Sequence, residues 1–133
     1  MAESQADQTS LNQGRTFVWH ELNTPDVEGS VAFYTKALNF GTLTAPMGEM
    51  GDYTMLTRNE IPVCGVIELR EGSVPHWSTY LSVTDVDASL AAAEENGAAV
   101  LVPAFDVPTI GRMGLIQDPQ GAHIWLFKGE PQE

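Results

Sequence analysis

The chain has only one cysteine, Cys64, among its 133 residues. A single thiol excludes an internal disulfide and a zinc site built from a cysteine cluster. No stretch reaches the roughly 18 consecutive apolar residues that a membrane-spanning helix needs. Residues 1–8 are polar and lack the basic and apolar regions of a secretory signal. We therefore expect a cytoplasmic protein without a membrane partner, in which Cys64 is a buried structural thiol.

Basic residues are also scarce. Six Lys and Arg residues stand against eighteen Asp and Glu residues, which gives a formal net charge of −12. Such a chain repels phosphate polyanions, so we expect no nucleic-acid partner. The length and the 43% hydrophobic content allow one sizeable core and exclude two ordinary domains. The polar, aperiodic residues 1–14 are typical of a disordered or loosely docked arm, which leaves a single domain at 15–133.

The hydrophobic pattern predicts the element order βαβββ twice. Aromatic and β-branched residues at 16–22 indicate a strand, and Thr24 followed by Pro25 is typical of the start of a helix. Turn-forming residues then separate three expected strands. These strands are expected at 41–45, 52–57 and 62–69. The second set comprises a strand at 76–83, a helix at 85–96, a strand at 99–102, and a hairpin of 114–117 and 122–127.

An internal repeat supports this order. A shift of 59 positions brings identical residues together. The identities are Leu22 with Leu81, Asp26 with Asp85, Val27 with Val86, Ser30 with Ser89, and Ala32 with Ala91. Two unrelated amphipathic helices would share a pattern but seldom these identities. Self-similarity at a fixed period indicates a duplicated unit, so we predict an α+β protein of two modules, 15–72 and 73–133.

These motifs resemble a known superfamily. The run from Leu22 to Tyr34, its echo from Leu81 to Ala91, and the turn Asp118-Pro-Gln-Gly121 are similar to those of the vicinal oxygen chelate superfamily, which includes glyoxalases, bleomycin resistance proteins and dioxygenases. The segments Trp19-His-Glu-Leu, Pro75-His-Trp and Gly111-Arg-Met-Gly resemble its glyoxalase-like or hydroxylase-like branch. The resemblance implies two tandem βαβββ modules that form curved mixed sheets around a central cleft. It also implies a small-molecule ligand and a homodimer.

The resemblance also locates the positions that bind metal in some members. These members take one ligand, typically His or Glu, from the first and the last strand of each module. The corresponding positions here are Trp19, Glu68, Ser78 and Trp125. An indole has an N–H donor and no acceptor lone pair, whereas a divalent ion needs three or more N, O or S donors. We therefore expect no metal at this position and no cofactor, with a displaced metal as the open alternative.

Side chains alternate across a strand, which predicts the other residues on the face of these four positions. They are Phe17, Glu21, Cys64, Val66, Arg70, His76, Tyr80, His123 and Phe127. His20 is expected on the opposite, helix-packed side. An aromatic wall suits a planar or extended apolar ligand, and the alternative is that the rings pack a closed core. The predicted ligand-binding residues are Phe17, Trp19, Glu21, Glu68, Ser78, Tyr80, Trp125 and Phe127.

Three of these side chains are also candidates for catalysis. Imidazole titrates near pH 6.5, so His76 and His123 beside Glu68 could support enolisation or epimerisation without a metal. The alternative is that both imidazoles only border solvent. The leading hypothesis is a metal-independent small-molecule-binding protein. Its rivals are a lyase, isomerase or dioxygenase-like enzyme that uses these residues or a displaced metal, and a structural or interaction module without a ligand-sized cavity.

Overall fold

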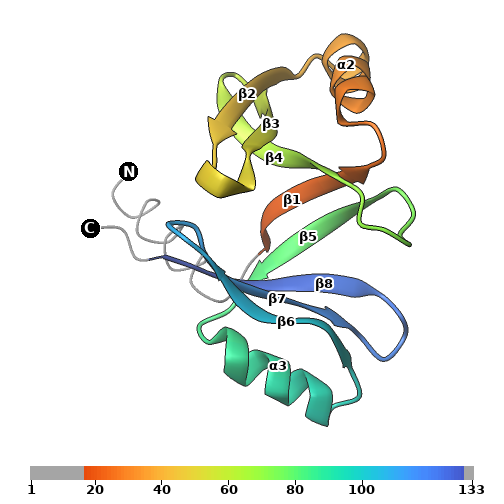
Figure 1. Ribbon diagram of the computed structural model, residues 1–133. Helices are drawn as coiled ribbons and strands as arrows, with labels where there is room; N and C mark the ends of the chain where they lie inside the picture. The colour runs from red at the N-terminus through yellow and green to blue at the C-terminus, as the bar shows by residue number, and fades with distance from the viewer. Residues whose placement is uncertain (1–16, 131–133) are drawn as a thin grey trace. The chain divides into compact units, whose positions relative to one another are not determined.

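The computed structural model describes residues 17–130 (Figure 1), so the arm predicted at 1–14 lies outside the described residues. The chain divides into two compact units. The N-terminal unit is Trp19–Ser78, and the C-terminal unit comprises Phe17, Val18 and the described residues from Thr79 onward. No helix in residues 17–130 has both the length and the apolar character needed to cross a bilayer.

The N-terminal unit is a four-stranded mixed sheet with one helix. Its elements are β1 (Phe17–Thr24), α2 (Val27–Leu38), β2 (Gly41–Pro46), a 3-10 turn η1 (Gly48–Met50), β3 (Asp52–Arg58) and β4 (Ile61–Glu68). The strand order is β2-β3-β4-β1. β1 and β4 are parallel, and the other neighbours are antiparallel. The predicted strand and helix order of this module is confirmed.

The C-terminal unit repeats this arrangement. Its elements are β5 (His76–Ser82), α3 (Val86–Glu95), β6 (Ala99–Val107), β7 (Gly111–Gln117) and β8 (His123–Gly129), in the strand order β5-β8-β7-β6. β5 and β8 are parallel. β6 is longer than the strand predicted at 99–102, because two register shifts let it keep pairing with β7 up to Val107. The predicted turn is confirmed, since the Asp118 carboxylate accepts the N–H groups of Gln120 and Ala122.

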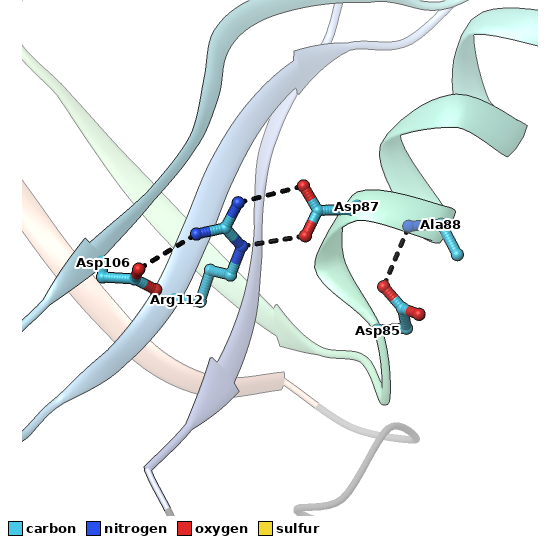
Figure 2. Close-up of polar contacts among 5 residues, drawn as sticks. All are labelled: Asp85, Asp87, Ala88, Asp106 and Arg112. Atoms are coloured by element: carbon cyan, nitrogen blue, oxygen red, sulfur yellow. Dashed lines mark hydrogen bonds and ion pairs between the residues drawn. The ribbon is translucent and has the colours of Figure 1, made fainter.

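Both helices begin at an aspartate. The Asp26 carboxylate accepts the Gly29 N–H at 2.9 Å, and the Asp85 carboxylate accepts the Ala88 N–H at 3.0 Å (Figure 2). The prediction of Thr24 as the N-cap is wrong: Thr24 belongs to β1, and its hydroxyl accepts the Asp26 N–H at 3.1 Å. Asp26 and Asp85 are partners in the 59-residue repeat, so the two units start their helices in the same way.

Each unit has its own apolar core between its helix and one face of its sheet. The N-terminal core is built from Leu22, Leu56, Cys64 and Val66, so the prediction of a buried thiol is confirmed. The C-terminal core is built from Val86, Leu90, Ile116 and Leu126. Val86 and Leu90 of α3 are fully buried, whereas α2 contributes no fully buried residue. The duplicated helices therefore pack to different depths.

An ion-pair network connects α3 to the β6–β7 hairpin (Figure 2). The Arg112 guanidinium donates two hydrogen bonds to the Asp87 carboxylate, at 2.9 and 3.0 Å, and lies 3.1 Å from the carboxylate of Asp106. The hydrogen bonds from Arg112 lower the pKa of Asp87 below its ordinary value. All three groups are exposed, so this network orients α3 and contributes little to stability.

Candidate functional site

One face of β1 carries a chain of hydrogen bonds. Trp19, Glu21 and Asn23 alternate along the strand and therefore share that face. The Trp19 indole N–H donates to the Tyr53 phenol oxygen at 2.9 Å, and the Tyr53 hydroxyl donates to the Glu21 carboxylate at 2.5 Å. Glu21 is only 6% exposed, and a buried carboxylate is costly unless it accepts hydrogen bonds. We call Trp19, Tyr53 and Glu21 the indole–phenol–carboxylate chain.

The same face of β1 also positions Ser78. The Asn23 side-chain amide donates to the Ser78 hydroxyl at 2.7 Å. It also lies within hydrogen-bond distance of the backbone carbonyls of Glu21, at 3.2 Å, and His76, at 3.4 Å. Asn23 is buried, so these contacts satisfy an amide that would otherwise be costly to bury. They hold Ser78 in one orientation.

Burial determines the protonation states around this face. Removal from water, followed by the nearby charge of Glu21, raises the pKa of the Tyr53 phenol far above its ordinary value. Burial is also the largest cause that raises the pKa of the Cys64 thiol. Both groups are therefore neutral at physiological pH. Tyr53 acts as a fixed O–H donor to Glu21, and Cys64 lacks the thiolate form that would make it a nucleophile.

The pairing of β1 with β4 decides which residues face this chain. Glu21 is the partner of Gly65, and Thr24 is the partner of Glu68. Gly65 leaves room for the Tyr53 ring, because a Cβ atom there would overlap the phenol oxygen. Cys64, Val66 and Glu68 consequently share the opposite face with Leu22 and Thr24. The expectation that Cys64 and Val66 lie on the face of Trp19 is therefore wrong, and Glu68 is exposed on the far side.

A comparison of the two units explains this result. In the C-terminal unit Tyr80 pairs with Trp125. Glu21, which corresponds to Tyr80 in the 59-residue repeat, pairs with Gly65. Gly65 is therefore the counterpart of Trp125, and the sequence alignment that placed Glu68 there is wrong by three residues. A shift by an odd number of residues moves every side chain of a strand to the other face. Arg70, which was also expected on the face of Trp19, lies beyond the end of β4.

The C-terminal unit carries a cluster of aromatic rings. Tyr80 stacks on Trp125 with ring centroids 5.4 Å apart and 9° between the ring planes. Phe127 meets Tyr80 edge to face, and Phe105 meets Trp125 in the same way, both at 6.3 Å. Tyr80 is buried, Trp125 and Phe127 are half-buried, and Phe105 is 37% exposed. We call these four residues the aromatic face.

Four functional residues were missed by the sequence analysis: Asn23, Tyr53, Gly65 and Phe105. Phe105 lies in the part of β6 beyond the predicted strand. Asn23 could have been found from the sequence, because it lies two residues after Glu21 and four after Trp19 and therefore shares their face of the strand. Tyr53 and Gly65 had no local signal, since their roles depend on pairing between strands. Phe17, which was predicted to bind ligand, is 55% exposed.

The two candidate catalytic histidines are exposed. The His76 ring nitrogen Nδ1 lies 2.6 Å from the carbonyl oxygen of Val74. The His123 Nε2 lies 3.0 Å from the side-chain oxygen of Gln117. Glu68, the third member of the predicted catalytic set, is exposed at the end of β4. A catalytic role for these three residues stays a prediction.

The residues at the four positions that the resemblance indicates do not fit a metal ion. The Trp19 N–H is donated to Tyr53, and Trp125 is stacked on Tyr80. Glu68 faces away from Trp19 because of the β4 register. In the part of the chain that the structure describes, no group of three or more His, Cys, Asp and Glu side chains is arranged to bind an ion.

Comparison with known proteins matches residues 16–126 to the Glyoxalase/Bleomycin resistance protein/Dioxygenase superfamily. The chain belongs to this superfamily. It is 32% identical over 126 residues to CFP32 of Mycobacterium tuberculosis, a protein provisionally named a glyoxylase. The matched region covers 94% of this chain and 48% of CFP32. It is 27% identical to the anthracycline biosynthesis protein DauV of Streptomyces sp. strain C5. This match covers 83% of this chain and 46% of DauV. The chain thus spans about half the length of these relatives.

Solved structures agree on the superfamily fold. The methylmalonyl-CoA epimerase of Mycobacterium tuberculosis superposes with a TM-score of 0.63 at 16% sequence identity, over 89% of this chain and 90% of the epimerase. Identity at this level concerns the fold alone. The predicted superfamily and the α+β order of two βαβββ modules are therefore confirmed.

The raised pKa of Tyr53 predicts a pH dependence of stability. When the pH rises above the ordinary tyrosine pKa of about 10, the unfolded chain releases the Tyr53 proton before the folded chain does. The unfolded state then binds fewer protons, so the stability contribution of the neutral phenol is lost as pH rises, by up to about 1.4 kcal/mol per pH unit. Urea unfolding between about pH 9 and about pH 11 should show this slope, with Tyr53→Phe shallower. Equal slopes for wild type and Tyr53→Phe would contradict the assignment, and Tyr34→Phe is the control.

Gly65→Ala should displace the Tyr53 ring and break the indole–phenol–carboxylate chain. The expected loss is about 1–3 kcal/mol in the free energy of unfolding, typical of overpacking. A double-mutant cycle with Tyr53→Ala separates this clash from other effects. In the Tyr53→Ala background the added methyl group no longer meets a ring, so Gly65→Ala should cost much less. An undiminished cost would show that Gly65 is required for another reason.

Proposed function

We propose that this superfamily member binds a small organic molecule with a flat aromatic part, without a metal ion at the family position. The observation that carries this proposal is the aromatic face of the C-terminal unit. Trp125 is fixed by a parallel stack on Tyr80 and by the edge of Phe105, and it remains partly exposed. Rings that are already ordered lose little conformational entropy when a ligand stacks on them.

The charge of the chain supports the polar part of the proposal. The acidic balance of the chain, with a net charge of −12, favours cationic ligands over anionic ones. We therefore propose a planar ligand with a cationic or hydrogen-donating group. Tyr80, Trp125 and Phe127 of the C-terminal unit are the proposed binding residues.

The name of one relative indicates a class of probe. DauV is named for anthracycline biosynthesis, and an anthracycline combines a flat ring system with an amino sugar. It matches the proposed chemistry and serves here as a test ligand. We further propose a cytoplasmic homodimer, for which superfamily membership is the support.

The rival proposal is a lyase, isomerase or dioxygenase-like enzyme that uses His76, His123 and Glu68. Each of these side chains is exposed. The described contacts of the two imidazoles are with the Val74 carbonyl and with Gln117. No contact among the described residues favours acid–base chemistry at these positions over ligand binding.

Titration with an anthracycline should quench the tryptophan fluorescence of the protein in a saturable manner. Trp125→Leu should weaken binding at least about tenfold, equivalent to about 1.4 kcal/mol, because a stacking partner is lost. Trp77→Leu is the matched control, since Trp77 is an exposed indole that contacts Tyr34 and lies outside the aromatic face. Equal weakening by both variants would contradict the proposed role of the aromatic face.

Metal analysis of the purified protein tests the second part of the proposal. We expect less than one equivalent of Ni, Zn, Fe and Mn together per chain, and ligand affinity that is unchanged by a chelator. A tightly bound stoichiometric ion, or affinity lost with chelation and restored by one metal, would overturn metal independence.

A further inference from the structure

A groove lies on the face of the N-terminal sheet that is opposite to the indole–phenol–carboxylate chain. Its volume is about 310 Å³. The lining residues are Val27, Glu28, Val31 and Ala32 of α2, Thr42 and Thr44 of β2, and Thr54 of β3. Thr54 is the partner of Val66, which belongs to the core beneath α2. The groove is therefore separate from the surface to which the proposed function assigns a ligand.

The internal repeat shows why this groove exists. Val27, Val31 and Ala32 correspond to Val86, Leu90 and Ala91. In the C-terminal unit, Val86 is 2% and Leu90 is 8% exposed, whereas the corresponding valines of α2 are only partly buried. The helices present similar side chains, so the difference originates in the sheets.

The sheet beneath each helix differs in polarity. α3 packs against Val100 and Ala104 of β6 and Ile116 of β7. The groove beside α2 has threonines on β2 and β3 instead. A hydroxyl group is costly to bury without a hydrogen-bond partner. This cost explains why α2 does not close onto β2 and β3 as α3 closes onto its own sheet.

The three threonines form a regular array. Thr44 and Thr54 are cross-strand partners, and Thr42 lies two residues from Thr44 and so shares its face. Within residues 17–130, none of the three hydroxyls has a protein hydrogen-bond partner. One wall of the groove thus offers hydroxyl groups to a ligand, and the opposite wall offers aliphatic side chains.

Charge selects among possible ligands. Glu28 is exposed in the first turn of α2 and lines the groove. None of the lining residues is basic, and the whole chain is strongly acidic. An anion would be repelled, whereas a cation would find a carboxylate next to hydroxyl acceptors.

We propose that this groove is a second ligand site that binds a small organic ammonium ion with an aliphatic chain or ring. The aliphatic part contacts Val27, Val31 and Ala32. The ammonium group donates to the threonine hydroxyls and faces Glu28. The volume is at the lower end of the range of about 300–1,000 Å³ for ligand pockets, which limits the occupant to a single ring or a short chain.

Amide NMR spectra of the full chain test this site. Hexylammonium is the probe, hexanoate is the control for charge, and methylammonium is the control for the aliphatic part. We expect saturable shifts for hexylammonium, concentrated at residues 27–32, 42–44 and 54. Methylammonium and hexanoate should bind at least about tenfold more weakly, because each lacks one of the two recognition elements.

The repeat supplies a matched pair of variants. Ala32→Leu fills the groove and should weaken hexylammonium binding about tenfold or more. Ala91→Leu makes the same change at the corresponding, exposed position of α3 and should have no effect. Leu is a good helix former, so both variants should fold. Glu28→Gln should weaken binding about two- to fivefold, as expected for an exposed charge.

Three results would overturn the proposal: no saturable shifts with hexylammonium, equal affinity for hexanoate, or equal effects of Ala32→Leu and Ala91→Leu. Thr44→Val, which removes a hydroxyl at nearly constant shape, gives a second readout if Ala32→Leu is unstable. Trp125→Leu should leave hexylammonium binding unchanged, and Ala32→Leu should leave anthracycline binding unchanged. These two controls separate failure of the groove from failure of the proposed function.

Discussion

The parallel pairing of β4 with β1 is the constraint on which the N-terminal unit depends. It sets Gly65 beside Glu21, and the missing Cβ atom leaves the space in which the Tyr53 ring lies. Backbone hydrogen bonds along parallel strands maintain this register over several residues. With the register in place, Tyr53 meets both Trp19 and Glu21, and Cys64 and Val66 turn toward α2.

Duplication gave two units whose local features agree and whose interfaces differ. Both helices start at an aspartate cap, and both units pair their first strand in parallel with their last. The difference arises where the helix meets its sheet. Apolar residues of β6 allow α3 to bury Val86 and Leu90, whereas threonines of β2 and β3 leave a groove beside α2. A small change in polarity thus converts a core interface into an accessible surface.

Trp19 and Trp125 are stabilised by different means. Trp19 uses its only polar atom to donate to Tyr53, and Trp125 uses the flat surface of its ring to stack on Tyr80. Trp19 is therefore held by its N–H group, and Trp125 by one face of its ring. The hydrogen bond also shows how a buried carboxylate is accommodated, because the neutral Tyr53 hydroxyl donates to Glu21 directly. Aromatic side chains thus contribute both stacking and directional hydrogen-bond donors to these two surfaces.

Sequence patterns were enough to predict the order of elements, the duplication, the buried thiol and the Asp118–Gly121 turn, because these features depend on local periodicity and turn chemistry. The start of α2 was predicted two residues early, because a helix cap depends on which side chain reaches the free N–H groups. The end of β6 was predicted too soon, because the extent of a bulged strand depends on its partner strand. Sequence patterns did not predict that Glu68 faces away from Trp19 or that the Tyr53 hydroxyl donates to Glu21, because both depend on how the strands pair. Strand register is set by contacts between residues far apart in the sequence, and one odd shift exchanges the two faces of a strand.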